Sequence, residues 1–274
     1  MLITFIGGGN MATALITGLM NPPRAHLKIR VCDPNKDARK HLEKTFRVAT
    51  FTDAHAAIAG ADVFVLAIKP QTMPMVLANL KGQVRPDQLV LSIAAGVTIS
   101  SIFAELGEGP TVIRSMPNTP ALIGHGITGV VADANSNAVH RGQAEEILSA
   151  AGEVVWLDDE LLMDAVTAIS GTGPAYYFLL TEALAAAARE LGLPAETAER
   201  LAAITCFGAG AMLASSPGEA QELRRRVTSP GGTTQAAMVV MKNGKFRELV
   251  SSAAEPARDR SRELAMSTSQ EDQE

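Results

Sequence analysis

A glycine run close to residue 1 limits the folds open to this chain more than any other segment. Gly7-Gly8-Gly9-Asn10-Met11-Ala12 directly follows the apolar stretch Leu2–Ile6, so a G-x-G-x-x-A pattern stands between an expected strand and an expected helix. Gly7 permits a tight turn, Gly9 lets the backbone approach a pyrophosphate at the positive helix end, and Ala12 lets the helix pack on a sheet. The pattern predicts dinucleotide binding, and an ordinary glycine turn is the alternative.

Short β-branched apolar runs alternate with helix-length segments from residue 2 to residue 157. The expected strands are Leu2–Ile6, Lys28–Asp33, Asp62–Lys69, Leu89–Ala95, Thr111–Met116, Ile127–Ala132 and Glu153–Leu157. The expected helices are Met11–Met20, Lys36–Lys44, Ala54–Ala59, Met73–Leu80, Ser100–Glu105 and Ser136–Ala150, with Asn35, Thr52 and Ser136 as N-caps. This alternation predicts an α/β fold with a parallel, doubly wound sheet of the Rossmann type.

Beyond residue 159 the strand signal ends and alanine-rich helical stretches follow. Helices are expected at Leu161–Ile169, Ala175–Leu191, Ala195–Ala214, Gly218–Val227, Thr233–Asn243 and Phe246–Met266, before a frayed tail at Ser267–Glu274. We therefore expect a dinucleotide-binding domain over 1–159 and an all-helical domain over 160–274. Ala183–Ala188 and Ala202–Ala214 are nearly apolar all round, which predicts that helices of a second copy cover them.

Charge and composition exclude several classes of protein. The 274 residues include 24 Lys and Arg against 29 Asp and Glu, a formal net charge of −5, with no long basic run, so we expect no nucleic-acid partner. The uncharged stretch Leu201–Gly218 is rich in Ala, Gly, Ser and Thr, which favours a buried helix of a soluble protein over a membrane span. Two distant cysteines, Cys32 and Cys206, and the absence of a secretory pattern at the start predict a cytoplasmic protein without a metal site.

The end of the second expected strand bears on the choice of nucleotide. Asp33 stands where an acid accepts hydrogen bonds from a ribose 2′-hydroxyl, which favours NAD. Lys36 and Arg39 follow at once, and these two cations can hold a 2′-phosphate if Asp33 turns away. An Asx turn with Pro34 is a third interpretation of Asp33.

Six segments, in order, resemble one enzyme family over nearly the whole chain. They are FIGGGNMA at Phe5–Ala12, AIKPQ at Ala67–Gln71, SIAAGV at Ser92–Val97, MPNTP at Met116–Pro120, SGTGPAY at Ser170–Tyr176 and VTSPGGTT at Val227–Thr234. These six segments identify the chain as similar to the pyrroline-5-carboxylate reductase family. The resemblance implies reduction of L-1-pyrroline-5-carboxylate to L-proline in the last step of proline biosynthesis, usually with NADPH and sometimes with NADH. It also implies a homodimer formed through the helical domain, and often a decamer.

Carried over by the resemblance, the site residues divide between two ligands. The cofactor-binding set is Ile6, Gly7, Gly8, Gly9, Asn10, Met11, Ala67, Ile68, Lys69, Pro70, Ala95, Pro117 and Asn118, to which the ribose argument adds Asp33 and Lys36. The substrate-binding set is Ser229, Gly231, Gly232, Thr233 and Thr234, and Thr234 is the catalytic group that hydrogen-bonds the imine nitrogen. Taken alone, Lys69-Pro70 reads as a solvated charge before a helix, and S-P-G-G-T-T as a helix start with a threonine cap.

The chemistry of C=N reduction needs few acid–base groups, because a protonated cyclic imine is already electrophilic and positioning dominates. In agreement, none of the five histidines falls in the matched segments, and we expect all five in loops or on solvent faces. A β-hydroxyacid dehydrogenase is the rival enzyme, but Tyr177 stands where that family has its lysine acid/base. A non-catalytic dinucleotide sensor is the other alternative, and it has no need of the S-P-G-G-T-T segment.

Overall fold

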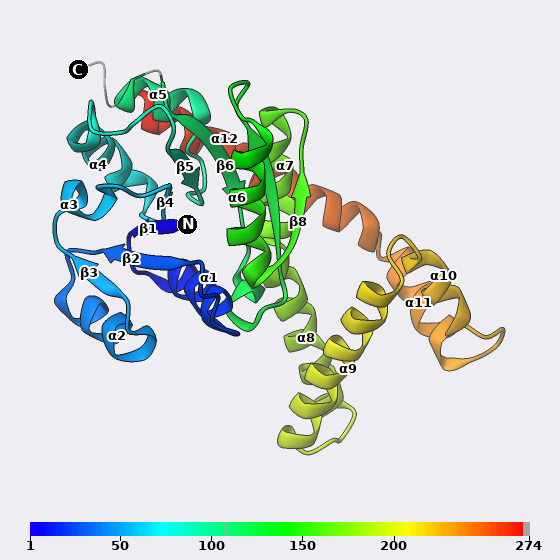
Figure 1. Cartoon of the computed structure of the whole chain (residues 1–274). Helices are drawn as coiled ribbons and strands as arrows, with labels where there is room; N and C mark the ends of the chain where they lie inside the picture. The colour runs from blue at the N-terminus through cyan, green and yellow to red at the C-terminus, as the bar shows by residue number, and fades with distance from the viewer. Residues whose placement is uncertain (108, 271–274) are drawn as a thin grey trace. The chain divides into compact units, whose positions relative to one another are not determined.

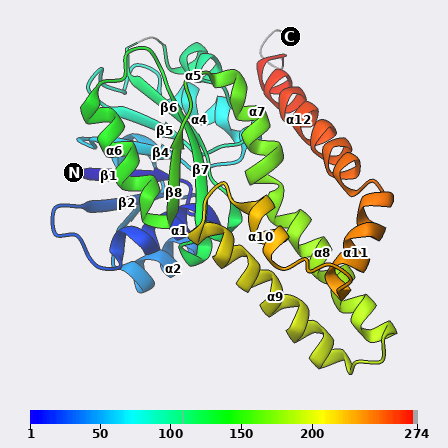
Figure 2. The ribbon, with the colours of Figure 1, turned by 90° about the vertical axis from the view of Figure 1, so that its right-hand side faces the viewer.

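The chain forms two compact units in a computed structural model that describes residues 1–107 and 109–270 (Figures 1 and 2). The first unit comprises Met1–Thr172 together with the last part of the chain, from Ala257. The second unit comprises Gly173–Pro256. The expected division at 159/160 stays a prediction about the domains, while the compact units divide 13 residues later, at 172/173.

The first unit is built on an eight-stranded sheet in the order β3-β2-β1-β4-β5-β6-β7-β8. The strands are β1 Leu2–Ile6, β2 Lys28–Cys32, β3 Ala49–Phe51, β4 Val63–Leu66, β5 Leu89–Ser92, β6 Thr111–Met116, β7 Gly126–Ala132 and β8 Gly152–Trp156. The connecting helices are α1 Asn10–Met20, α2 Lys36–Phe46, α3 Ala54–Ile58, α4 Met73–Leu80, α5 Ile99–Leu106 and α6 Ala138–Leu148. Short 3₁₀ turns lie at η1 Pro70–Thr72, η2 Thr119–Ile123 and η3 Ser149–Ala151. The Rossmann-type fold expected from the sequence is confirmed.

Both faces of the central strands β4 and β5 are buried, which explains why these strands are almost entirely apolar. Alternate side chains of a strand point to opposite faces, so Val65 of β4 joins the core that includes Leu15 of α1. Its neighbour Phe64 joins the other core, which includes Leu77 of α4. Helices thus cover the sheet on both sides, as a doubly wound fold requires.

Two local expectations for the first unit are wrong, and one strand was not expected. β7 runs antiparallel to β6, because the nine residues 117–125 between them are too few for a crossover helix. β3 is a strand of only three residues, too short for a periodic signal. Helices α3 and α6 are capped by Asp53 and Asn137 rather than by Thr52 and Ser136, since these side chains accept the first-turn N–H bonds.

The rest of the chain is helical, as expected. It contains η4 Glu160–Leu162, α7 Met163–Val166, the π-helix η5 Thr167–Gly171, α8 Gly173–Glu190, α9 Ala195–Ser215, α10 Ala220–Arg226, α11 Thr233–Asn243 and α12 Phe246–Gln270. The single helix expected over 161–169 is therefore three short pieces. Residues 267–270 continue α12 rather than fray, and the remainder of the expected tail, 271–274, lies outside the described residues.

Helices α8 and α9 of the second unit leave large apolar side chains exposed. Phe178 and Leu179 of α8 are 67% and 65% exposed, and Ile204 and Phe207 of α9 are 62% and 69% exposed. A stable protein covers so much apolar surface in an assembly. Within the described residues, no helix is both long and apolar enough to span a membrane.

Candidate active site

The glycine loop lies where the strand order reverses, between neighbouring strands β1 and β4. Gly7 has a φ of +98°, and a Cβ atom on it would collide with the carbonyl group of Ala67 at the end of β4. Its N–H donates to the carbonyl oxygen of Cys32 at 2.8 Å. Only glycine allows both the positive φ and the close approach of the Ala67 carbonyl. Open α/β sheets bind their ligands at such a switch point in the strand order.

The start of α1 presents free backbone donors next to this turn. Gly9 is the N-cap of α1, and no side chain caps the helix. Gly9 and Asn10 are exposed, Met11 is half-buried, and Ile6 and Gly8 are buried, so Ile6 and Gly8 can reach a ligand only through their backbones. An uncapped helix start beside glycine fits an anionic pyrophosphate.

Asp33 is engaged by the backbone on both of its carboxylate oxygens. Oδ2 accepts from the N–H of Gly8 at 2.7 Å, and Oδ1 accepts from the N–H of Asn35 at 2.7 Å. The Asx-turn interpretation is thus realised, and the same side chain also braces the glycine loop. Arg39 donates to the carbonyl oxygens of Asp33 and Pro34 at 2.7 and 3.0 Å, which holds its guanidinium beside this turn.

Lys36 is exposed in the first turn of α2, next to Asn35, the N-cap of that helix. A carboxylate turned toward the glycine loop and two cations near the start of α2 fit a 2′-phosphate.

Burial raises the pKa of the neighbouring Cys32 thiol, and the negative charges of Asp53 and Asp33 raise it further. Cys32 is therefore a neutral thiol at neutral pH.

The ends of β4 and β5 carry the other expected nucleotide residues. Ala67 is half-buried and donates its N–H to the carbonyl of Ile6 at 2.8 Å, whereas Lys69 is exposed at the start of η1. Ile68 and Pro70 are half-buried. Ala95 is half-buried beside Gly96, whose missing Cβ would lie 3.2 Å from the Cβ of Leu264 in α12.

The side chain of Asn118 is buried and hydrogen-bonds to two other segments of the chain. Its Nδ2 donates to the carbonyl of Ser170 at 3.1 Å, and its Oδ1 accepts from the N–H of Ile127 at 3.0 Å. Pro117 is buried as well. The side-chain amide thus joins the end of β6, the start of β7 and the π-helix.

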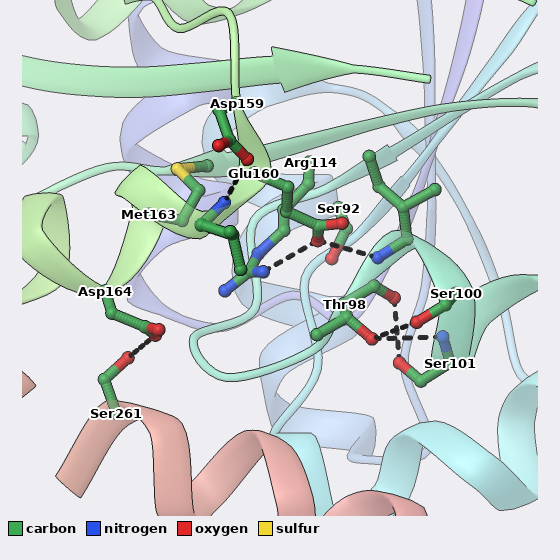
Figure 3. A network of polar contacts seen from close by, with 12 residues as sticks. Ser92, Thr98, Ser100, Ser101, Arg114, Asp159, Glu160, Met163, Asp164 and Ser261 are labelled. Carbon is green, nitrogen blue, oxygen red and sulfur yellow. Dashed lines mark hydrogen bonds and ion pairs between the residues drawn. The ribbon is translucent and has the colours of Figure 1, made fainter. Parts of the chain in front are cut away.

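A second polar network includes residues near the carboxyl ends of β5 and β6 (Figure 3). Arg114 of β6 donates from Nη1 to Oε1 of Glu160 at 2.7 Å, and the same oxygen accepts from the N–H of Ile99 at 2.9 Å. Ser261 of α12 donates to Oδ1 of Asp164 at 2.7 Å. The bonds of Glu160 hold the start of α5 against β6, and the bond of Ser261 holds α12 against α7.

The S-P-G-G-T-T segment forms the turn before α11 in the second unit. Gly231 has a φ of +72°, and the N–H of Gly232 donates to the carbonyl of Ser229 at 3.1 Å. Gly232 is the N-cap and no side chain caps the helix, so the alternative of a threonine cap is wrong. Thr233 and Thr234 are the first two residues of α11, exposed and half-buried respectively. The turn presents backbone N–H groups suited to a carboxylate.

The sequence reasoning missed the roles or surroundings of four residues. Arg114 and Glu160 are 46 residues apart, and only a charge inside an apolar strand hinted at Arg114. Gln235 accepts from the N–H of Gly231, and its place in the first turn of α11 is the position of a capping box. His140 is buried on α6 rather than on a solvent face.

Two family models match the chain. Residues 160–264 match pyrroline-5-carboxylate reductase dimerisation, and residues 2–96 match NADP oxidoreductase coenzyme F420-dependent. Within the described residues, no group of three side chains suited to a metal ion occurs.

Individual relatives cover almost the whole chain. A pyrroline-5-carboxylate reductase of Pseudomonas aeruginosa is 47% identical over 263 residues, 96% of this chain and 96% of the relative. One of Haemophilus influenzae is 39% identical over 96% of this chain and 97% of its own length. A solved pyrroline-5-carboxylate reductase structure from Coxiella burnetii has a TM-score of 0.91 at 40% identity, covering 96% of this chain and 98% of the other. A Plasmodium falciparum structure, described with NADP bound, has a TM-score of 0.82 at 28% identity, covering 96% and 97%.

Proposed function

The chain belongs to the pyrroline-5-carboxylate reductase family, and from that premise we propose how its residues carry out the reaction. It is an NADP(H)-dependent oxidoreductase of proline biosynthesis that reduces the C=N bond of L-1-pyrroline-5-carboxylate to give L-proline. Family membership sets aside the dehydrogenase and sensor alternatives. The observation that carries the proposal is the presence in one chain of the Gly7 turn and the Gly231–Gly232 turn, each with backbone N–H groups at an uncapped helix start.

The first unit binds the nucleotide. The uncapped start of α1 holds the pyrophosphate, and Lys36 and Arg39 face the 2′-phosphate across the Asp33 turn. The backbone from Ala67 to Pro70, with Ala95, lies along the nucleotide, and the loop at Pro117 and Asn118 faces the nicotinamide. NADPH, when bound, supplies the hydride. The support for these roles is the position of all these segments at the carboxyl ends of β1, β2, β4, β5 and β6.

The second unit binds the substrate. Backbone N–H groups of the segment from Ser229 to Thr233, among them that of Gly231, hold the ring carboxylate, and the Thr234 hydroxyl hydrogen-bonds the ring nitrogen of the imine. Because the protonated imine is already electrophilic, the protein has to orient the imine carbon rather than to supply a strong acid or base. After hydride addition the nitrogen carries the amine proton of proline.

An assay with both nucleotides tests this function. With pyrroline-5-carboxylate as substrate, we expect the absorbance of NADPH to fall, with a slower fall for NADH, and L-proline to accumulate in equal amount. A protein that binds NADPH but leaves the imine unreduced would contradict the proposal.

Asp33 sets part of the preference between the two nucleotides. We expect Asp33→Ser to raise the ratio of kcat/KM with NADPH to kcat/KM with NADH about fivefold, because removing a carboxylate near a 2′-phosphate is worth about 1 kcal/mol. Asp37→Ser removes an exposed carboxylate from the same helix start and is the matched control, with an unchanged ratio. An unchanged ratio in Asp33→Ser would mean that Asp33 does not act on the ribose.

Assembly is expected to be obligatory for folding. The dimerisation family match and the exposed apolar faces of α8 and α9 support a homodimer that has no stable monomer. Sedimentation at micromolar concentration is expected to give dimers, or decamers made of five dimers, and no folded monomer. A folded monomer there would contradict this prediction.

We place the enzyme in the cytoplasm. Its two cysteines are free, and its relatives are biosynthetic enzymes. Fractionation of cells that express it, with detection of the intact chain, tests this location.

A further inference from the structure

The N–H groups of the substrate turn are not equally available. The N–H of Gly232 is used within the turn, since it donates to the carbonyl of Ser229 at 3.1 Å. The N–H of Gly231 donates to Oε1 of Gln235 at 2.5 Å. Gln235 lies in the first turn of α11, one residue after Thr234. Its side chain therefore reaches back over the turn and holds one of the N–H groups of the proposed carboxylate site.

We propose that Gln235 is an internal competitor of the substrate carboxylate: its amide oxygen holds the N–H of Gly231 in the free enzyme and releases it when the substrate binds. The inference rests on the proposed function, because it takes the turn as the carboxylate site. Both acceptors are sp² oxygens of similar reach, and a single N–H donates one strong bond. Substrate affinity is then reduced by the cost of displacing Gln235.

The surroundings of Gln235 allow this release. The side chain is exposed and lines a cavity of about 970 Å³ formed by α10, α11 and the start of α12. Arg224, Lys242 and Arg247 line the same cavity, against one carboxylate, that of Glu248. A freed glutamine amide has solvent and space on this side, and the excess of cations favours an incoming anion.

A purely structural role makes a different prediction. A glutamine three residues after the N-cap stabilises a helix start by accepting backbone N–H bonds. Its loss then lowers thermal stability and leaves the Michaelis constant for the substrate unchanged or higher. Competition predicts instead that the Michaelis constant for the substrate falls when the amide oxygen of Gln235 is removed.

The experiment compares variants of the full-length enzyme with saturating NADPH. Gln235→Leu removes the acceptor and is expected to lower KM for pyrroline-5-carboxylate about threefold, with kcat and KM for NADPH unchanged, in line with the modest net worth of one hydrogen bond. Gln235→Met is the second, unbranched variant without the amide and is expected to act alike. Gln235→Glu places a charged acceptor on the same N–H and is expected to raise KM about tenfold.

Gln221→Glu is the matched control, because it adds the same charge to the same cavity from α10. Its KM is expected to change less than twofold. The proposal is overturned if Gln235→Leu and Gln235→Met leave KM unchanged or raise it, or if Gln221→Glu raises KM as much as Gln235→Glu. Failure of the underlying function is a separate outcome: the wild-type enzyme then turns over no pyrroline-5-carboxylate at all.

Discussion

Replacing Thr234 by valine is expected to lower kcat/KM for pyrroline-5-carboxylate about ten- to a hundredfold, because a hydrogen bond worth roughly 1–3 kcal/mol is lost at the imine nitrogen. Valine keeps the shape and β-branching of threonine and removes only the hydroxyl. Thr234 is the second residue of α11, half-buried, directly after a helix start that has no side-chain cap. The fold of the turn is therefore expected to survive, and the loss is expected in catalysis.

Nucleotide binding provides the internal check on this variant. The expected nucleotide residues lie in the first unit and Thr234 lies in the second, so KM for NADPH is expected to stay within twofold of wild type. Thr181→Val is the matched control, since its hydroxyl donates to the carbonyl of Tyr177 one turn earlier in α8. Full efficiency in Thr234→Val, or a parallel loss of NADPH binding, would show that the substrate does not bind at this turn.

Glu160→Ala is expected to lower the free energy of unfolding by about 3 kcal/mol, because it leaves the buried Arg114 guanidinium without its counter-charge. The Arg114 side chain is 6% exposed, and its partner oxygen on Glu160 lies 2.7 Å away (Figure 3). The same oxygen accepts the N–H of Ile99 at the start of α5, so a buried backbone donor loses its partner as well. Urea unfolding at one fixed protein concentration measures the change.

Two further variants separate charge from hydrogen bonding. Glu160→Gln keeps an acceptor for Arg114 and Ile99 and is expected to cost less than Glu160→Ala. Asp87→Ala breaks the exposed pair between Arg85 and Asp87, whose side chains are 44% and 72% exposed, and is expected to cost far less than Glu160→Ala because solvent screens this pair. The interpretation is rejected if Glu160→Ala destabilises the enzyme no more than Asp87→Ala does.

Backbone requirements were readable from residue types alone. Gly7 adopts a positive φ against the carbonyl of Ala67, a conformation and a distance that only glycine allows, and the sequence predicted its turn. Apolar runs predicted the strands of the first unit to within a few residues, apart from β3, because a buried strand needs apolar side chains along its length. The helix Thr233–Asn243 was predicted at its observed bounds. The roles of the site residues were carried over from the family and stay predictions that the experiments above test.

Partners and directions became visible only once distant segments were brought together in space. The apolar pattern of β7 is the same for either direction, and the short link from β6 decides that it runs antiparallel. From the sequence alone, the carboxylate of Asp33 can accept a hydrogen bond from a ribose, from its own turn or from another loop. Folding places the N–H of Gly8, 25 residues away, on that carboxylate. In the same way Asn118 hydrogen-bonds to Ser170, 52 residues away, and Arg114 pairs with Glu160, 46 residues away. Local residue type states which bonds a side chain can make, and the three-dimensional packing of the chain selects the one that it does make.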